Sequence, residues 1–243
     1  MRLAGRMLSE LSIADYASSM VYDDAIDCAF YKALHEPTIL EFHALHFTSR
    51  ENKVRKKEKM KDTYESNLRH FWIQTATGNK FYVDDPKVED VDARDIVHAL
   101  PKICRYAGHC TGFYSVAEHS VIVADEVMSR FKNFELARAA LLHDAPEAYL
   151  TDLPSPIKRL CPDYQALEGK VGTILEKKFD LKYSLDDDRI RQVDFEVFLA
   201  EKDQIMPKPW EVPGDPAKVK IRCLDPQKAR DYFYEAMLDY KLM

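Results

Sequence analysis

Ala139-Ala-Leu-Leu-His-Asp-Ala-Pro-Glu-Ala-Tyr149 is an apolar, helix-compatible run that places an imidazole and a carboxylate side by side. His143 and Asp144 are adjacent, and Glu147 follows one helical turn after His143, on the same face of a helix. Burying these groups among alanine and leucine costs free energy unless an opposite charge compensates. The run therefore predicts a helix over residues 135–149 that binds a divalent metal ion.

Composition and charge favour a helical globular protein. The chain has 243 residues, 46% of them hydrophobic and 31% charged, and its seven glycines are few. A net charge of −6 argues against a general nucleic-acid-binding protein, whose surface should be basic. The five cysteines form no C-x-x-C pair, and neither a secretory leader nor a membrane-length apolar run occurs. We therefore expect a cytoplasmic protein with reduced thiols.

Three regions of the chain differ in residue composition and sequence pattern. Residues 1–69 form an N-terminal extension with helix-compatible stretches and a charged block at 49–62. Because acids are mixed with its bases, this block is interpreted as a solvated helix face or linker, with a nucleic-acid-binding tract as the alternative. Residues 71–86 carry β-branched and aromatic residues around Gly78-Asn79, which predicts a β-hairpin. Residues 70–243 are expected to form one domain.

Helical patterns dominate after residue 92. The predicted helices cover residues 92–100, 115–131, 135–149, 164–179, 187–206 and 226–240. Residues 153–158 are predicted to be a proline-braced loop, and residues 208–225 an irregular, proline-rich segment. The predicted fold class is therefore all-α, a helical bundle with a small β-hairpin before its core and a mainly helical N-terminal extension.

Two further ionisable residues fall on helix faces that are otherwise apolar. His119 lies on a stripe of valines, and Asp194 shares a face with Phe198 and Glu201. Alone, each is better explained as a hydrogen-bonded core residue or a salt-bridge partner. Together with the imidazole and carboxylate of the opening run, they offer two imidazoles and two carboxylates. That set suits Mn²⁺, Fe²⁺, Co²⁺, Ni²⁺ or Zn²⁺ better than Ca²⁺.

The ordered set His119 … His143-Asp144 … Asp194 resembles the H…HD…D signature of the HD-domain metal-dependent phosphohydrolase superfamily. Within it, the run from Trp72 to about Met206 is similar to the branch of YfbR-type 5′-deoxynucleotidases and phage DatZ-like dATP triphosphohydrolases. The matching phrases are Trp72-Ile-Gln-Thr, Arg105-Tyr-Ala-Gly-His109, Tyr114-Ser-Val-Ala-Glu-His-Ser120, Leu141-Leu-His-Asp-Ala-Pro-Glu-Ala-Tyr149, Asp152-Leu-Pro-Ser-Pro-Ile-Lys158 and Glu201-Lys-Asp-Gln-Ile-Met206. The resemblance covers somewhat over half of the chain.

The resemblance implies a catalytic metal site and its active residues. It assigns His119, His143, Asp144 and Asp194 as ligands of one catalytic divalent ion, with Mg²⁺ in addition if the substrate is a triphosphate. Glu147, acting with Asp144, resembles the residue that orients or deprotonates the attacking water. The alternative for Glu147 is a carboxylate that only supports His143.

Five further residues are candidates for substrate binding. Arg105 and Lys158 are candidate phosphate ligands, with a plain surface charge as the alternative for each. Tyr106 is a candidate to stack on the base or sugar, and His109 to approach the phosphate. Asp152 resembles the position that contacts the sugar 3′-hydroxyl in the family, and a turn residue is its alternative.

The sequence thus predicts a metal-dependent enzyme that hydrolyses the 5′-phosphate ester of nucleotides, with a lean towards purine deoxynucleotides such as dATP. Release of triphosphate from a dNTP and removal of phosphate from a dNMP both stay open. A non-catalytic metal- or nucleotide-binding sensor is the main alternative, and a nucleic-acid-binding module is a weaker one. The resemblance also implies a homo-oligomer, and we expect neither a stable nucleic-acid partner nor a membrane partner.

Overall fold

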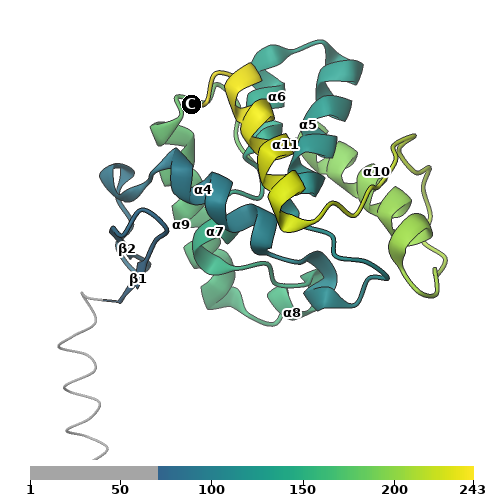
Figure 1. Ribbon diagram of the computed structural model, residues 1–243, viewed down its shortest axis with the longest axis horizontal. Helices are drawn as coiled ribbons and strands as arrows, with labels where there is room; N and C mark the ends of the chain where they lie inside the picture. The colour runs from purple at the N-terminus through teal and green to yellow at the C-terminus, as the bar shows by residue number, and fades with distance from the viewer. Residues whose placement is uncertain (1–70) are drawn as a thin grey trace, which may run out of the picture. The chain divides into compact units, whose positions relative to one another are not determined.

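The computed structural model describes residues 71–243, a short hairpin followed by helices (Figure 1). The predicted N-terminal extension over residues 1–69 and its charged block at 49–62 lie outside the described residues. No helix of the described part is both long and apolar enough to cross a bilayer.

The described residues are mostly helical, as predicted. The helices are α4 (Ala93–Ala99), α5 (Val116–Phe131), α6 (Phe134–Leu141), α7 (Glu147–Leu150), α8 (Ser155–Lys158), α9 (Pro162–Lys178), α10 (Asp188–Ile205) and α11 (Pro226–Asp239). Single 3₁₀ turns occur at Val88–Asp90, Leu100–Lys102 and Arg105–Gly108. The predictions of helices at 92–100, 115–131, 164–179, 187–206 and 226–240 are confirmed, with boundaries that agree within about two residues.

Polar side chains set where five of these helices begin. The side chains of Asp92, Ser115, Asn133, Asp187 and Asp225 each accept a backbone N–H of the first turn that has no partner within the helix. These residues therefore fix the entry points of α4, α5, α6, α10 and α11. Between α10 and α11 the chain is irregular, as the prolines of residues 208–225 predict.

The predicted hairpin is confirmed. Strands β1 (Trp72–Gln74) and β2 (Lys80–Tyr82) pair antiparallel, and Gly78 supplies the positive φ of 85° that their turn requires. The backbone N–H and hydroxyl of Thr77 donate to the Asp95 carboxylate on α4, at 2.7 and 3.1 Å. These contacts fix the hairpin on α4.

A predicted single helix over residues 135–149 is wrong. Helix α6 ends at Leu141 and α7 begins at Glu147, so His143 and Asp144 lie in the turn between them. The cause is Pro146, which has no N–H to continue the α-helical ladder. The Leu142 N–H instead bonds to the Ala139 carbonyl, only three residues back. The i, i+4 relation assumed for His143 and Glu147 on one helix therefore does not hold.

The prediction of a loop at residues 153–158 is also wrong in part. Ser155–Lys158 form α8, a single helical turn, with Pro156 near its start. A proline at the first positions of a helix removes no intrahelical hydrogen bond, because those N–H groups have no partner there in any case. The Pro-Ser-Pro phrase thus begins a helix.

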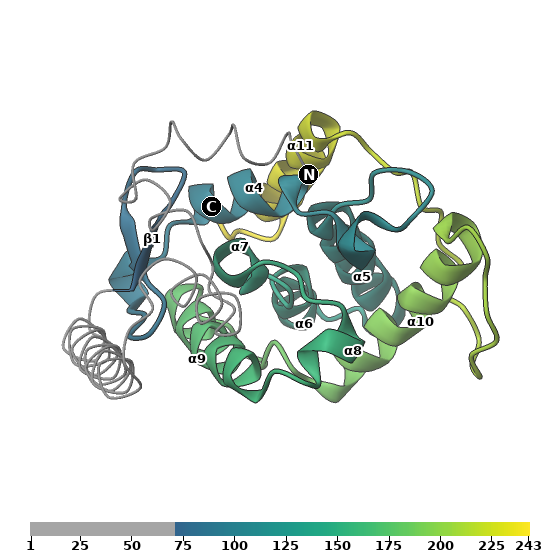
Figure 2. The same cartoon turned by 90° about the horizontal axis from the view of Figure 1, so that it is seen from below.

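Helix α5 is the central element of the described residues. It contacts α6, α10 and α11, which surround it in Figure 2. The predicted valine stripe is fully buried: Val116, Val123 and Val127 have no exposed surface. His119 on the same helix is equally buried.

A buried carboxylate on α5 fixes the irregular segment before α11. Glu118 has no exposed surface, and its two carboxylate oxygens accept the backbone N–H groups of Arg222 and Leu224, both at 2.8 Å. These bonds give two backbone N–H groups of this irregular stretch the acceptors that a helix or strand would otherwise provide. The C-terminal helix is therefore connected to the core partly through one glutamate.

Replacing this glutamate should destabilise the fold. In Glu118→Gln the side chain keeps one acceptor oxygen, and its amide NH₂ faces the second backbone N–H. We expect a loss of about 1–3 kcal/mol in the free energy of unfolding, measured by urea titration with circular dichroism. The matched control is Glu126→Gln on the same helix, whose surface ion pair should contribute less than about 1 kcal/mol. Equal losses for the two variants would contradict this role of Glu118.

Candidate metal centre

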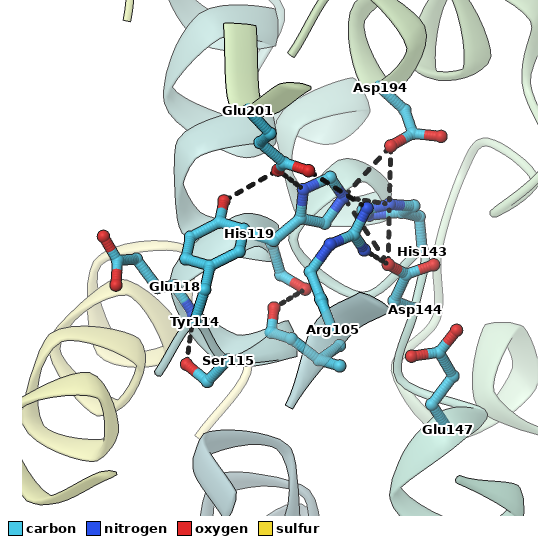
Figure 3. A network of polar contacts seen from close by, with 12 residues as sticks. Arg105, Tyr114, Ser115, Glu118, His119, His143, Asp144, Glu147, Asp194 and Glu201 are labelled. Atoms are coloured by element: carbon cyan, nitrogen blue, oxygen red, sulfur yellow. Dashed lines mark hydrogen bonds and ion pairs between the residues drawn. The ribbon is translucent and has the colours of Figure 1, made fainter. Parts of the chain in front are cut away.

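The His119 imidazole is held on one side by a buried carboxylate (Figure 3). Its Nδ1 lies 2.6 Å from Oε1 of Glu201, and both side chains are fully buried. Burial acts to raise the pKa of Glu201, but Arg105 and His119 lower it to about 2. Because an ionised carboxylate only accepts, Nδ1 carries the proton. The other nitrogen, Nε2, points towards His143, Asp144 and Asp194.

His143 presents the same nitrogen from the opposite side. Its Nδ1 lies 2.8 Å from the carbonyl oxygen of Ala140, and a carbonyl can only accept a hydrogen bond. Nδ1 therefore carries a proton, and Nε2 is the nitrogen that can face a metal ion. The two Nε2 atoms of His119 and His143 lie 3.3 Å apart.

Two aspartates complete the group. Oδ1 of Asp194 lies 3.0 Å from Nε2 of His119 and 3.9 Å from Nε2 of His143. Oδ2 of Asp144 lies 3.5 and 3.3 Å from the same two nitrogens. Ligand atoms of His119, His143 and Asp194 all lie within 4.8 Å of one another, a spacing that can hold a metal ion. The structure thus brings together the four residues predicted as ligands.

The electrostatics of this group favour a cation. The two Nε2 atoms, 3.3 Å apart, and the two nearby carboxylates favour a positive charge between them, either a proton on one ring or a metal ion. Burial and Arg105 act to lower the pKa of His119, but Glu201 and Asp194 raise it to about 9. Burial likewise acts to raise the pKa of Asp144, but His143, His119 and Arg105 hold it well below its usual range. A mixed nitrogen and oxygen donor set of this kind fits a divalent transition metal ion.

The centre is open to solvent on one side. The Asp194 side chain is 40% exposed, whereas that of His119 is fully buried. An accessible side is what a catalytic site needs and a closed structural site lacks.

Arg105 pairs with two carboxylates of the centre. Its Nη1 lies 3.1 Å from Oδ2 of Asp144, and its Nη2 lies 3.5 Å from Oε2 of Glu201. The next residue, Tyr106, donates its hydroxyl to Oε2 of Glu201. Tyr106 and Ala107 have left-handed φ angles of 58° and 50°, which cost free energy for residues with a Cβ atom. Arg105 as a phosphate ligand and Tyr106 as a stacking residue stay predictions.

Glu147 lies next to the centre with one oxygen unpaired. It is 3% exposed, its Oε1 is 3.7 Å from Nζ of Lys158, and its Oε2 is buried without a partner. Burial, and then the charges of Asp144 and Asp152, raise its pKa well above the usual range. Figure 3 shows its carboxylate on the Asp144 side of the centre. A buried carboxylate with a raised pKa beside other charged groups is a candidate functional residue.

Lys158 and Asp152 belong to the same neighbourhood. Lys158, on α8, makes its shorter ion pair with Glu168, at 2.6 Å. Asp152 has a raised pKa, caused first by burial, while Arg105 acts to lower it and Asp144 to raise it. Both residues thus lie within electrostatic range of the centre, as their predicted roles require.

Within the described residues, no hydrogen bond or ion pair joins His109, another predicted site residue, to the centre. It is exposed at the end of the turn Arg105–Gly108. Among the described residues, its side chain takes part in none of the hydrogen bonds or ion pairs around the four ligands. Its contact with a substrate phosphate stays a prediction.

Glu201 is the residue that sequence reasoning missed. The sequence places it on the face of α10 that carries Asp194, two turns away, and this was the available signal. The sequence does not show which side chains pack against that face. The structure supplies them: His119 and also Tyr114, whose hydroxyl donates to Oε1 of Glu201 at 2.7 Å.

Comparison with known proteins gives two relatives and no family. The chain is 43% identical over 110 residues to the uncharacterised protein YfdR of Escherichia coli K12, which is 45% of this chain and 59% of that protein. It is 34% identical over 120 residues to an uncharacterised protein of Rhodobacter capsulatus, 47% of this chain and 61% of the relative. The chain thus spans about three fifths of the length of these relatives. No family model matches it.

Removing one ligand should weaken metal binding. We expect Asp194→Asn to lower the affinity for Co²⁺ by at least ~10–100-fold. A loss of that size is typical when a residue that only supports a ligand through a hydrogen bond is removed. Calorimetric titration of the full-length, chelator-stripped protein measures this. Asp203→Asn, which removes an exposed carboxylate from the same helix, is the control and should bind as the wild type does. If both variants bind Co²⁺ equally well, Asp194 is not a ligand.

Proposed function

We propose that this protein is an HD-domain phosphohydrolase that uses one divalent transition metal ion to hydrolyse the 5′-phosphate ester of nucleotides. The observation that carries the proposal is the meeting of two imidazole Nε2 atoms and two carboxylates at one point. Their order along the chain, His119, His143-Asp144 and Asp194, matches the signature that the sequence resembles. The alternative of a non-catalytic sensor has no specific observation in its favour.

The bound ion would supply two kinds of chemistry. It lowers the pKa of a coordinated water and polarises a phosphoryl oxygen, both of which favour attack on phosphorus. The side chains of His119, His143, Asp144 and Asp194 would hold the ion, and substrate would approach from the side of Asp194, which is partly exposed.

Glu147 is proposed to hold and deprotonate the attacking water. As the water oxygen bonds to phosphorus, the bond from phosphorus to the leaving 5′-oxygen breaks. Glu147 takes one proton of the water, and the leaving oxygen takes a proton from solvent. The unpaired, buried Oε2 of Glu147 is an acceptor in need of a donor. Burial and the charges of Asp144 and Asp152 raise its pKa, which makes this carboxylate a stronger proton acceptor than an ordinary one.

Lys158 and Arg105 are proposed to neutralise the phosphate. Lys158 lies 3.7 Å from Glu147, so an anion held there would be next to the attacking water. Its 2.6 Å ion pair with Glu168 would have to loosen when a phosphate takes its place. Arg105 has a buried Nε without a partner in addition to its two ion pairs, and thus retains a free donor.

The proposed substrates are purine deoxynucleotides. They include dATP, cleaved to release triphosphate with the help of Mg²⁺, and dNMPs, cleaved to release phosphate. Asp152 is proposed to contact the sugar 3′-hydroxyl, Tyr106 to face the base or sugar, and His109 to approach the phosphate. A cytoplasmic location and a homo-oligomeric state are further proposals. The first is supported by the four described cysteines, all of which are free.

Product analysis tests the proposal directly. The full-length protein, stripped with chelator and reloaded with Mn²⁺ or Co²⁺, is incubated with each common dNMP and dNTP, and the products are identified by mass spectrometry. We expect phosphate or triphosphate release only after reloading, and none from Asp144→Asn. Turnover that is indifferent to chelation, or retained by Asp144→Asn, would contradict the metal mechanism.

The role of Glu147 gives a separate prediction. Glu147→Gln should lower turnover by about 10²–10⁴-fold, because the amide cannot accept the proton. Co²⁺ affinity, measured by calorimetry, should stay close to that of the wild type. Glu126→Gln, on the surface of α5, serves as the control for both measurements. Parallel losses of turnover and affinity in Glu147→Gln would instead make Glu147 a support for the ligands.

A further inference from the structure

Glu201 accepts hydrogen bonds from four side chains around the centre. It lies on α10 with no exposed surface. The donors to its carboxylate are His119 Nδ1 at 2.6 Å, the Tyr114 hydroxyl at 2.7 Å, the Tyr106 hydroxyl, and Arg105 Nη2 at 3.5 Å. Figure 3 shows the Glu201 carboxylate between the Tyr114 hydroxyl and the His119 ring. A fully buried carboxylate with this many donors is fixed in place.

We propose that Glu201 is a positioning residue of the metal centre, which fixes the His119 ring so that Nε2 faces the ion and thereby strengthens metal binding. This inference rests on the proposed function, since it assumes that the centre binds a metal. Glu201 itself is not a ligand: its oxygens are occupied by the four donors.

The contact with Glu201 selects one tautomer of His119. Because the Glu201 oxygens already accept from Tyr114, Tyr106 and Arg105, the tautomer that has its lone pair on Nδ1 would face a carboxylate oxygen at 2.6 Å without a proton between them. It would also point an N–H from Nε2 towards the position of the ion. The opposite tautomer removes both conflicts, because Nδ1–H donates to Glu201 and Nε2 offers its lone pair.

The two histidines donate their Nδ1–H groups to different kinds of acceptor. His143 donates its Nδ1–H to the neutral carbonyl of Ala140, whereas His119 donates to an ionised carboxylate. A charged acceptor forms the stronger hydrogen bond and makes the imidazole a better electron donor to a metal. The strength of His119 as an electron donor to the metal therefore depends on the side chain of Glu201, and mutation of Glu201 can test this dependence.

Glu201 also links separate segments of the centre. Arg105 bridges its Oε2 to Oδ2 of Asp144, which lies in the turn between α6 and α7. Helix α10 carries both Glu201 and the ligand Asp194, and α5 carries His119. One carboxylate thus fixes His119 directly, and through Arg105 it also restrains Asp144.

The test is metal affinity in Glu201→Gln, a variant of nearly the same shape that lacks the negative charge. Full-length protein is stripped and titrated with Co²⁺ alone, followed by calorimetry and by the visible absorption of the bound ion. We expect binding about 10–100-fold weaker than in the wild type, with a changed cobalt spectrum. The matched control is Glu118→Gln, a fully buried glutamate adjacent to His119 in sequence that bonds only backbone N–H groups. It should lose stability but keep the wild-type Co²⁺ affinity.

A measurement on the wild type covers the case in which Glu201→Gln does not fold. In ¹⁵N-histidine-labelled, Zn²⁺-loaded protein, the NMR shifts should show His119 protonated at Nδ1 and metal-bound at Nε2. Unchanged Co²⁺ affinity in a folded Glu201→Gln, or coordination through Nδ1, would overturn the inference while leaving the metal centre intact. A wild type that binds no Co²⁺ would instead contradict the proposed function.

Discussion

The described site depends on one close contact, the meeting of the Nε2 atoms of His119 and His143 at 3.3 Å in a buried place. Each ring is held there by a hydrogen bond at its other nitrogen, to Glu201 in one case and to the Ala140 carbonyl in the other. Two aspartates approach the same point. Such an arrangement concentrates lone pairs and negative charge, and it is stabilised when a cation occupies the space between them.

The elements around this point explain how it is maintained. Helix α5 is buried on its valine stripe and so cannot turn His119 towards solvent without exposing apolar surface. The break after Leu141 frees two adjacent residues from helical geometry, which lets His143 and Asp144 both contact His119. Helix α10 provides Asp194 at the open side and Glu201 at the closed side, two turns apart.

Much of this could be predicted from the sequence, because periodicity and capping residues are local signals. Ser115 and Asp187 mark where α5 and α10 begin, and the face containing Asp194 was identified correctly. The break at Pro146 was missed because the apolar pattern runs through it, although the missing N–H was a sufficient reason to expect one. The partners of Glu201, and the pairing of Lys158 with Glu168, depend on contacts between distant segments, which periodicity does not encode.

The central claim is that these four side chains bind one divalent ion, and anomalous diffraction tests it most directly. Crystals of the full-length protein soaked in Co²⁺ are measured on both sides of the cobalt absorption edge. The account predicts a single strong peak about 2 Å from Nε2 of both histidines and in contact with Asp144 and Asp194. No peak there, with the two imidazoles hydrogen-bonded to each other or to the aspartates, would contradict it.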